Sequence, residues 1–317
     1  MINQVVAVTG GTGSFGKSMV KELLTKGVKQ IRVLSRDELK QSQMKEEIND
    51  SRVEFFICDI RDAERLITAT EDVDIVIHAA AMKRIEVCEK DPQEAVKTNI
   101  NGTVNVANAC LRNNVKNAIF ISTDKACYPV NLYGATKLTA EKVWIQSNTY
   151  RGRNHPTKFS VVRYGNVLGS RGSVLHSFKN QLTAGVLKVT DQYMTRFFIT
   201  LQEAVDLVQL AIEEQQGGEI YTPNLKAVSI FRMAEMIAGK APVVITNQRG
   251  GEKLHETLIT VEECKRTECH GKYNVTDPEI TTWPYTRNDY NIPKFVTSET
   301  SEQYTDEELK KLLIHGN

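Results

Sequence analysis

The sequence has no long apolar run and almost no excess charge of either sign. No stretch approaches the roughly twenty apolar residues that a membrane-spanning helix needs. Its 40 Lys and Arg residues nearly balance 39 Asp and Glu residues, which leaves a formal net charge of +1. We therefore expect neither a membrane nor a nucleic acid as a partner.

Cysteine is scarce and scattered, with only six residues in a chain of 317. A chain of this length can fold without disulfides, which suits a reducing compartment. Cys264, Cys269 and His270 lie close together, but three soft ligands without a fourth favour an incidental cluster over a metal site. The start "MINQVVAVTGG" is typical of a strand entering a loop and not of a signal peptide. We expect a cytoplasmic protein with no metal.

Apolar, β-rich runs alternate with helical patterns over the first two-thirds of the chain. Runs that are apolar throughout, such as Ile75 to Ala81, are typical of strands buried on both faces of a sheet. Their alternation with helices predicts a parallel, doubly wound sheet of the Rossmann type in the α/β class. The expected helices are Ser14 to Lys26, Asp37 to Ile48, a short one from Asp62, Pro92 to about Asn113, and about Asn131 to Tyr150.

The alternation fades after about Asn166, and most prolines and irregular segments follow it. We expect residues 1–166 to form the nucleotide-binding domain, completed by about 196–224. Residues 167–195 and 225–317 would form a smaller C-terminal substrate-binding domain. No linker or repeat marks the boundary.

A glycine-rich loop lies between the first predicted strand and the first predicted helix. "VTGGTGSFGK" contains Gly11-x-Gly13-x-x-Gly16, and Gly10 precedes it. Glycines at this junction let backbone N–H groups approach a pyrophosphate at a helix N-terminus. A plain tight turn is the alternative, but the strand-loop-helix context favours a dinucleotide.

The end of the second predicted strand bears on the choice between NAD and NADP. An NAD site usually offers a carboxylate there, whereas this strand ends in Ser35 and Arg36, with Lys40 one helical turn further on. A hydroxyl and a cation suit a 2′-phosphate, so the pattern favours NADP. Alternatively, this is a solvated first turn in which Asp37 or Glu38 serves the helix N-terminus. The expected cofactor-binding set is Gly10, Thr12, Gly13, Ser14, Phe15, Gly16, Ser35, Arg36, Lys40, Asp59, Ile60, Ala79, Tyr133 and Lys137.

Proton-transfer groups crowd the stretch "STDKACYPVNLYGATK". Tyr133 and Lys137 are four residues apart on one face of a predicted helix. A nearby ammonium lowers the pKa of a phenol, so Tyr133 is a candidate base for a hydroxyl proton. Thr123, at the end of the fifth predicted strand, is placed to bind the same hydroxyl.

The glycine loop, Thr123, the YxxxK pair and "RYGNVLGSRG" together resemble an extended short-chain dehydrogenase/reductase. That family includes epimerases, reductases and 4,6-dehydratases of nucleotide sugars. Asp124 and Lys125 are surplus to an epimerase or a reductase, but a dehydratase must also remove the C5 proton and protonate the departing C6 hydroxyl. Lys125 is the candidate base and Asp124 the candidate acid, and both pKa values should shift toward neutrality. The alternative is a simple ion pair at a strand end.

A closer resemblance, over nearly the whole chain, is to the C5-inverting UDP-N-acetylglucosamine 4,6-dehydratases that open the pseudaminic acid pathway. It rests on "TGGTGSFGK", "IHAAAMK", "STDKA", "NLYGATKL", "FSVVRYGNVLGSRGSV", "MTRFFIT" and "GEKLHE". The resemblance implies oxidation at C4 by NADP⁺, loss of water across C5–C6, return of hydride to C6 and inversion at C5. It also implies UDP-N-acetylglucosamine as substrate and a homo-oligomer, a dimer or larger. The substrate-binding residues that it implies are Lys83, Asn99, Asn166, Arg171, Arg196, Arg249 and Glu252.

The sequence departs from the family pattern beside the proposed base, where "DKACYPVN" replaces "DKAANPxN". A bulky Tyr128 facing the site could stop the reaction at a 5,6-unsaturated sugar nucleotide. Alternatively, Tyr128 points outward, which is the interpretation we favour. A third possibility, from another class, is a non-catalytic NADP-sensing protein, which would not need all five groups at 123–125, 133 and 137.

Overall fold

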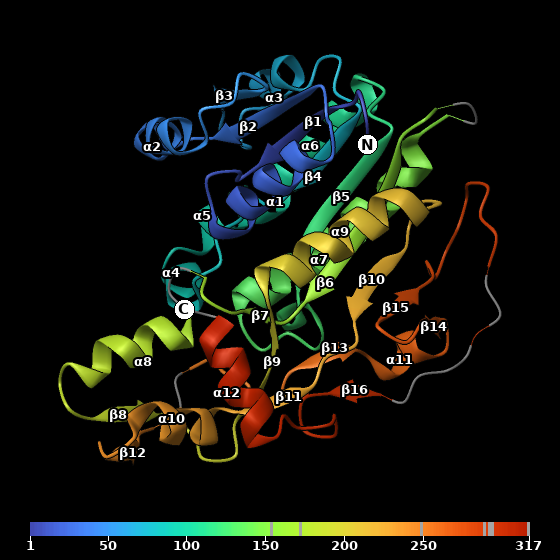
Figure 1. Ribbon diagram of the computed structural model, residues 1–317. Helices are drawn as coiled ribbons and strands as arrows, with labels where there is room; N and C mark the ends of the chain where they lie inside the picture. Colours follow the sequence, from blue (N-terminus) through green and yellow to red (C-terminus); the bar gives the residue numbers. More distant parts are fainter. Residues whose placement is uncertain (153–154, 171–172, 248–249, 288–289, 291–294, 316–317) are drawn as a thin grey trace.

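The computed structural model describes residues 1–152, 155–170, 173–247, 250–287, 290 and 295–315. In this part of the chain nine strands form one sheet, in the order β14-β15-β10-β6-β5-β4-β1-β2-β3 (Figure 1). The first six strands and β10 run parallel, while β15 and β14 extend the sheet antiparallel. From β3 the strands are β3 (Val53–Ile57), β2 (Gln30–Ser35), β1 (Val5–Thr9), β4 (Ile75–His78), β5 (Asn117–Thr123), β6 (Lys158–Tyr164), β10 (Ile220–Pro223), β15 (Tyr273–Thr276) and β14 (Thr267–Cys269).

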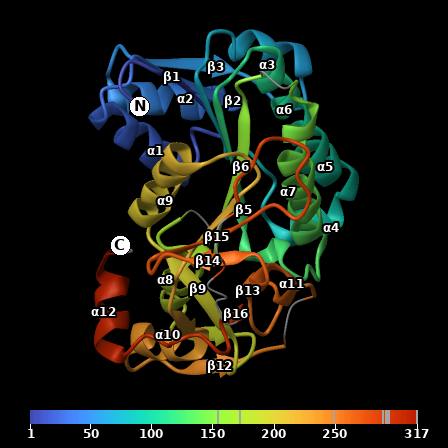
Figure 2. The ribbon, with the colours of Figure 1, turned by 90° about the vertical axis from the view of Figure 1, so that its right-hand side faces the viewer.

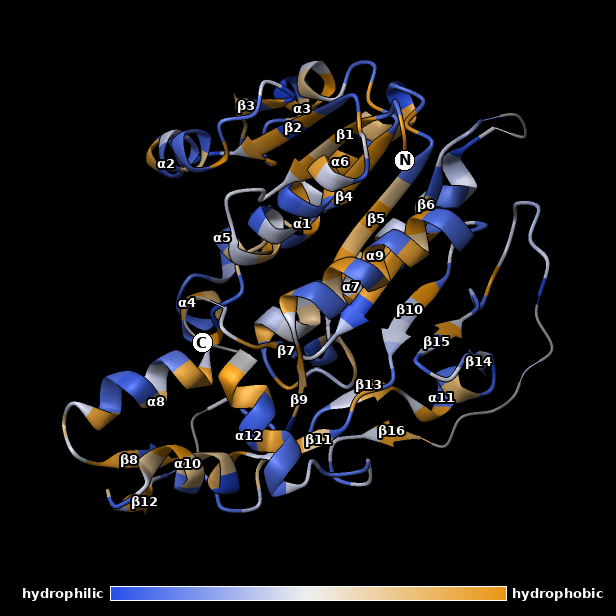
Figure 3. Cartoon of the chain, viewed as in Figure 1, coloured by the Kyte–Doolittle hydropathy of each residue, from blue (hydrophilic) through white to orange (hydrophobic). Residues whose placement is uncertain are grey.

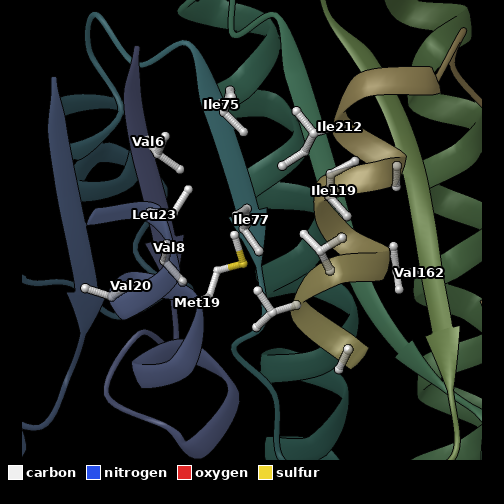
Figure 4. Close-up of a cluster of buried hydrophobic side chains, with 14 of the residues drawn as sticks. Val6, Val8, Met19, Val20, Leu23, Ile75, Ile77, Ile119, Val162 and Ile212 are labelled. Atoms are coloured by element: carbon white, nitrogen blue, oxygen red, sulfur yellow. The ribbon is translucent and has the colours of Figure 1, made fainter. Parts of the chain in front are cut away.

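Helices cover both faces of this sheet. One face carries α1 (Ser14–Thr25), α2 (Glu38–Ile48) and α9 (Leu201–Glu214), and the other carries α3 (Ala63–Ala69), α6 (Gly102–Arg112) and α7 (Leu132–Tyr150). Figure 4 shows side chains of α1 and α9 meeting those of β1, β4 and β5. The predicted α/β class with a doubly wound, largely parallel sheet is confirmed.

Strand β1 shows why the apolar runs predicted buried strands. All five of its residues are buried. Val6 and Val8 enter the core under α1 and α9, whereas Val5 and Ala7 enter the core under α3, α6 and α7. Alternate side chains of one strand therefore fill two cores, so neither face can be polar. In Figure 3, β1 and β2 are coloured as hydrophobic.

The helix expected from Pro92 to about Asn113 forms, but with an interruption. It begins as α5 (Pro92–Val96), widens into a π-helical turn, η1 (Lys97–Asn101), and continues as α6. A short helix, α4 (Ile85–Lys90), precedes it. Such π turns are frequent at functional sites, and this one carries Asn99.

The remaining elements gather below the large sheet in Figures 1 and 2 around two smaller cores. Helix α12 shows alternating hydrophobic and hydrophilic turns in Figure 3, and its Leu309 is buried in one of these cores. Strands β14 and β15 belong to the large sheet, although their residues fall within 225–317. The elements that gather below the large sheet are β7 (Asn166–Val167), α8 (Val174–Leu182), β8 (Leu187–Val189), β9 (Thr195–Ile199), β11 (Ala227–Ser229), α10 (Ile230–Ala238), β12 (Val243–Ile245), β13 (Thr257–Ile259), α11 (Val261–Cys264), β16 (Val296–Thr297) and α12 (Asp306–His315).

None of the helices in the described ranges is both long enough and apolar enough to cross a bilayer.

A buried arginine ties the large sheet to the C-terminal segment. Arg163 in β6 is 1% exposed and donates to Glu141 of α7, at 3.1 and 2.7 Å, and to Glu263 of α11, at 2.8 and 2.9 Å. Its fifth N–H group donates to the Leu258 carbonyl, at 2.9 Å. Burial opposes ionisation of Glu263, yet the charge and hydrogen bonds of Arg163 lower its pKa from 4.5 to about 2.

We expect Arg163→Met to lose about 3–5 kcal/mol of unfolding free energy in urea, because two buried carboxylates would lack their cation. The exposed Arg232, paired with Asp306, gives the control: Arg232→Met should lose no more than about 1 kcal/mol. Glu263 contributes its stabilisation above pH 4.5 and loses it as the pH falls toward 2, so the gap between wild type and Arg163→Met should narrow in acid. Equal losses in the two variants would contradict this role.

Candidate active site

The glycine loop between β1 and α1 is closely packed. Gly10 has φ +66°, and a Cβ atom there would lie 2.9 Å from backbone atoms of Ala80. A Cβ atom on Gly16 would lie 2.5 Å from Gly11 Cα. The N-terminus of α1 has no side-chain cap and no acidic residue in its first turn. This cradle of backbone N–H groups fits a phosphate, as the sequence predicts.

The end of β2 is arranged differently from the expectation. Ser35 is buried and its hydroxyl lies 2.9 Å from that of Thr12. Asp37 caps α2 by accepting from Lys40 N, at 3.0 Å, and its other oxygen pairs with the Lys40 ammonium. Lys40 and Asp37 thus pair with each other in the first helical turn, which matches the alternative that Asp37 serves the helix N-terminus. Arg36 remains exposed at the strand end.

The other predicted cofactor residues line the same edge of the sheet. The Asp59 carboxylate binds Arg61, whose hydrogen bonds lower the pKa of Asp59, with a smaller contribution from the charge of Arg36. Ile60 packs against Gly102, where a Cβ atom would lie 2.7 Å from its Cδ1. Ala79 N donates to Thr9 O just before the glycine loop, at 3.2 Å.

Asp124 and Lys125, the candidate acid and base, lie on a single 3₁₀ turn, η2 (Asp124–Ala126), directly after β5. The Asp124 side chain is fully buried, and its Oδ1 accepts from the Thr123 hydroxyl at 2.9 Å and from Lys125 Nζ at 3.0 Å. Its Oδ2 is buried and has no hydrogen-bond partner among the described residues. Burial raises the pKa of Asp124 against the opposing charge of Lys125, which is the direction predicted.

Lys125 is held by three groups. Its Nζ lies 3.0 Å from Asp124 Oδ1, 3.2 Å from Glu256 Oε1 and 3.3 Å from Asn166 Oδ1. Burial alone would lower the pKa of Lys125, but the carboxylates of Asp124 and Glu256 outweigh burial and raise it. The prediction that the pKa of Lys125 shifts toward neutrality is therefore wrong for the protein alone. The cause is the Asp124 carboxylate, reinforced by a second carboxylate, Glu256, that the sequence did not reveal.

Tyr133 and Lys137 both lie in the first turns of α7 and are both buried. Burial raises the pKa of Tyr133 to about 12, while the charge of Lys125 and a hydrogen bond with Thr123 oppose this rise. Burial lowers the pKa of Lys137 to about 7. Its Nζ donates to Ile121 O at 2.7 Å and lies 3.7 Å from the Phe120 ring centroid. The predicted lowering of the Tyr133 pKa by Lys137 is wrong for the protein alone, because the Lys137 amine is directed to β5.

Two of the substrate-binding residues that the resemblance implies lie in the cluster around Lys125. Asn166 and Arg196 lie with Lys125 and Glu256, but Arg196 Nη1 and Nη2 donate to the carbonyls of Thr195, Leu254 and Lys253. The Arg196 guanidinium is thus engaged in hydrogen bonds within the protein, unlike the substrate-binding arginine that the resemblance implies.

The Asn99 side chain also makes its hydrogen bonds within the protein. It exchanges hydrogen bonds of 2.7 and 2.9 Å with the Met82 backbone and donates to Thr136 Oγ1 at 3.0 Å. It thereby fixes the segment that carries Lys83, whose pKa is lowered by partial burial. Glu252 lies in the segment before Glu256, and Arg171 and Arg249 lie outside the described residues.

The two unusual residues after Ala126 face in opposite directions. Cys127 is buried, with Sγ 3.4 Å from Leu258 O. Tyr128 has φ +45° and is 46% exposed, and its hydroxyl donates to Glu262 Oε2 at 2.7 Å. The interpretation that Tyr128 points outward is confirmed.

Sequence reasoning missed Glu256 and Lys253. Both belong to "GEKLHE", where charged residues in an irregular segment look like a solvated surface. Glu256 is buried against Lys125, and Lys253 pairs with Glu256, because β13 packs on η2. The motif "GEKLHE" itself, which carries part of the family resemblance, was the signal that could have pointed to them.

The doubly wound sheet, the glycine loop and the Thr, Tyr and Lys groups at the end of β5 define an extended short-chain dehydrogenase/reductase. The chain belongs to the family described as "Polysaccharide biosynthesis protein", which matches residues 6–278.

Comparison with known proteins confirms the resemblance drawn from the motifs. The chain is 47% identical to the "UDP-N-acetylglucosamine 4,6-dehydratase (inverting)" of Campylobacter jejuni subsp. jejuni serotype O:23/36, over 87% of this chain and 83% of the relative. It is 38% identical to the "UDP-glucose 4-epimerase" of Rickettsia bellii, over 99% and 96% of the two chains. The solved structure of Pen from Bacillus thuringiensis superposes with a TM-score of 0.92 at 34% identity, covering 99% of this chain and 98% of that one.

The close contact between α7 and η2 can be tested by adding one methyl group. A Cβ atom on Gly134 would lie 2.2 Å from Lys125 O, whereas one on Gly152 would meet nothing within 4 Å. We expect Gly134→Ala to cost about 1–3 kcal/mol in urea denaturation, because the turn must move away from the helix. Gly152→Ala should unfold like the wild type. Equal midpoints for both variants would show that the contact does not constrain the turn.

Proposed function

We propose that the protein is an NADP-dependent UDP-N-acetylglucosamine 4,6-dehydratase, a hydro-lyase that inverts C5. The product would be UDP-2-acetamido-2,6-dideoxy-L-arabino-hex-4-ulose, in the first step toward pseudaminic acid-type sugars. The observation that carries this proposal is the buried Asp124–Lys125 contact of 3.0 Å beside Thr123 and Tyr133, with Asp124 Oδ2 unpaired among the described residues.

The Asp124–Lys125 contact favours a dehydratase over a 4-epimerase, which is the other activity named among the relatives. A 4-epimerase needs one group to exchange the proton of the C4 hydroxyl. A 4,6-dehydratase needs in addition a base for C5 and an acid for the C6 hydroxyl. Two further proton-transfer groups on one turn match the second requirement.

Tyr133 and Thr123 would serve the oxidation at C4, and Lys125 and Asp124 the elimination between C5 and C6. Tyr133 accepts the C4 hydroxyl proton, and Thr123 orients that hydroxyl. Neutral Lys125 removes the C5 proton, which the C4 ketone has made acidic, and protonated Asp124 donates a proton to the departing C6 hydroxyl. One proton moving from Lys125 Nζ to Asp124 over 3.0 Å converts the ion pair into this acid and this base without exchange with solvent.

The loop at Gly10, Gly13 and Gly16 and the N-terminus of α1 would hold a pyrophosphate, with Arg36 near the adenosine ribose. A bound nicotinamide dinucleotide supplies the acceptor and donor of hydride. We favour NADP because Arg36 is exposed at the end of β2 and the adjacent carboxylate, Asp37, is occupied by α2 and Lys40.

The domain ranges remain proposals. Residues 1–166 with 196–224 would bind the dinucleotide, and 167–195 with 225–317 would cover the UDP-sugar. We also propose a homo-oligomer, on the resemblance alone, and a cytoplasmic location, on the few and scattered cysteines of the sequence.

The test of the proposal is incubation of the protein with NADP⁺ and UDP-N-acetylglucosamine in deuterated water, followed by NMR of the product. We expect the 4-keto-6-deoxy-L-arabino sugar with deuterium at C5. An exocyclic 5,6-alkene would identify an elimination-only enzyme, and the C4 epimer would identify an epimerase. NADP binding without turnover would favour the sensing protein.

Lys125→Ala should lower the rate of product formation by about 10²–10⁴-fold, because it removes the amine proposed to take the C5 proton. The control is Lys142→Ala, which removes a lysine that is 60% exposed on the same helix as Tyr133. Turnover of Lys125→Ala at the wild-type rate would show that the base is wrongly assigned.

A further inference from the structure

Glu256 contacts Lys125, the proposed base, but the proposed mechanism gives Glu256 no role. It directly precedes β13 and is 2% exposed. Its backbone N–H donates to Ser298 Oγ at 2.9 Å, and its carbonyl accepts from Ser298 N at 2.8 Å. The C-terminal part of the chain therefore holds this carboxylate in place against η2.

Three cations surround the Glu256 carboxylate. Oε1 lies 3.2 Å from Lys125 Nζ and 3.8 Å from Arg196 Nε, and Oε2 lies 3.4 Å from Lys253 Nζ. Arg196 and Lys253 have backbone anchors of their own, since Lys253 Nζ donates to Cys127 O at 2.5 Å and Arg196 donates to three carbonyls. Lys125, by contrast, has a carboxylate on each side.

We propose that Glu256 is a positioning residue that holds the Lys125 ammonium against Asp124 and sets the pH range over which this pair works. The inference rests on the proposed function for its kinetic consequence, but the contact itself does not.

The two carboxylates of the cluster are not equivalent. Burial opposes ionisation of Glu256, but Lys125, Arg196 and Lys253 outweigh it and lower its pKa. Burial raises the pKa of Asp124, and the charge of Glu256 adds to that rise. Glu256 is thus the permanent counter-ion of Lys125, and Asp124 is the carboxylate that takes up a proton.

Removing the charge of Glu256 should lower the pKa values of both Lys125 and Asp124. Lys125 would lose a stabilising anion, which lowers its pKa, and Asp124 would lose a repelling anion, which lowers its pKa as well. The other charged or titratable groups facing the pair, Tyr133 on α7, Arg196 on β9 and Lys253, would remain. A variant with only a packing defect would instead lose rate uniformly at every pH.

The experiment compares Glu256→Gln with Glu256→Asp and with Glu262→Gln, a control that removes an exposed carboxylate six residues away. The first readout is acylation of Lys125 by acetic anhydride, followed by mass spectrometry across pH in the protein without substrate. We expect half-maximal acylation in Glu256→Gln to move to lower pH by about 1–3 units. Glu256→Asp should fall between it and the wild type, and Glu262→Gln should match the wild type.

The second readout is the pH profile of kcat/KM with UDP-N-acetylglucosamine. Both limbs should move to lower pH in Glu256→Gln, and Glu256→Asp should restore part of the shift. Unchanged acylation and an unshifted profile of lower height would overturn the role of Glu256. If Glu256→Gln does not fold, Glu256→Asp decides by the same two criteria. If the wild type forms no product but the acylation midpoint still shifts, the proposed function fails and the role of Glu256 stands.

Discussion

The hydrogen bond between Asp124 and Lys125 depends on where strand β5 ends. Strand β5 is central in the sheet, and its last residue, Thr123, is held by its pairing with Tyr164 of the parallel strand β6. The chain then makes one 3₁₀ turn and enters α7, and Gly134 lets that helix approach the Lys125 carbonyl. The proposed acid and base therefore share one rigid support with Tyr133, as the transfer of protons in a set geometry requires.

Two buried charge clusters join the C-terminal segment to this support. Arg163 binds Glu263 in α11, and Lys125 binds Glu256 next to β13. Breaking a buried pair is costly, so both clusters fix the segment 256–263 against the sheet. The first cluster involves no group of the proposed mechanism, whereas the second adds a carboxylate to the environment of the base. The C-terminal part thus contributes a carboxylate to the immediate surroundings of Lys125.

Much of the fold could be predicted because β1, β4 and the helices carry clear periodic patterns. The glycine loop and the turn at Asp124 were also evident, because each depends on residues that are adjacent in sequence. The residue type alone did not predict which partner a side chain binds where the fold brings more than one within reach. Lys40 turned to Asp37, and Arg196 to backbone carbonyls, because these groups lie within reach in the fold. Glu256 could not be foreseen, since its contact with Lys125 spans 131 positions and local patterns do not encode such contacts.

The central claim is that one turn adds elimination between C5 and C6 to oxidation at C4. UDP-N-acetylglucosamine carrying deuterium at C4 tests it most directly, by NMR and mass spectrometry of the product. The account predicts a 4-keto-6-deoxy sugar in which that deuterium has moved to C6 of the same molecule. Deuterium retained at C4 of an epimer would contradict it, as would an unsaturated product with none at C6.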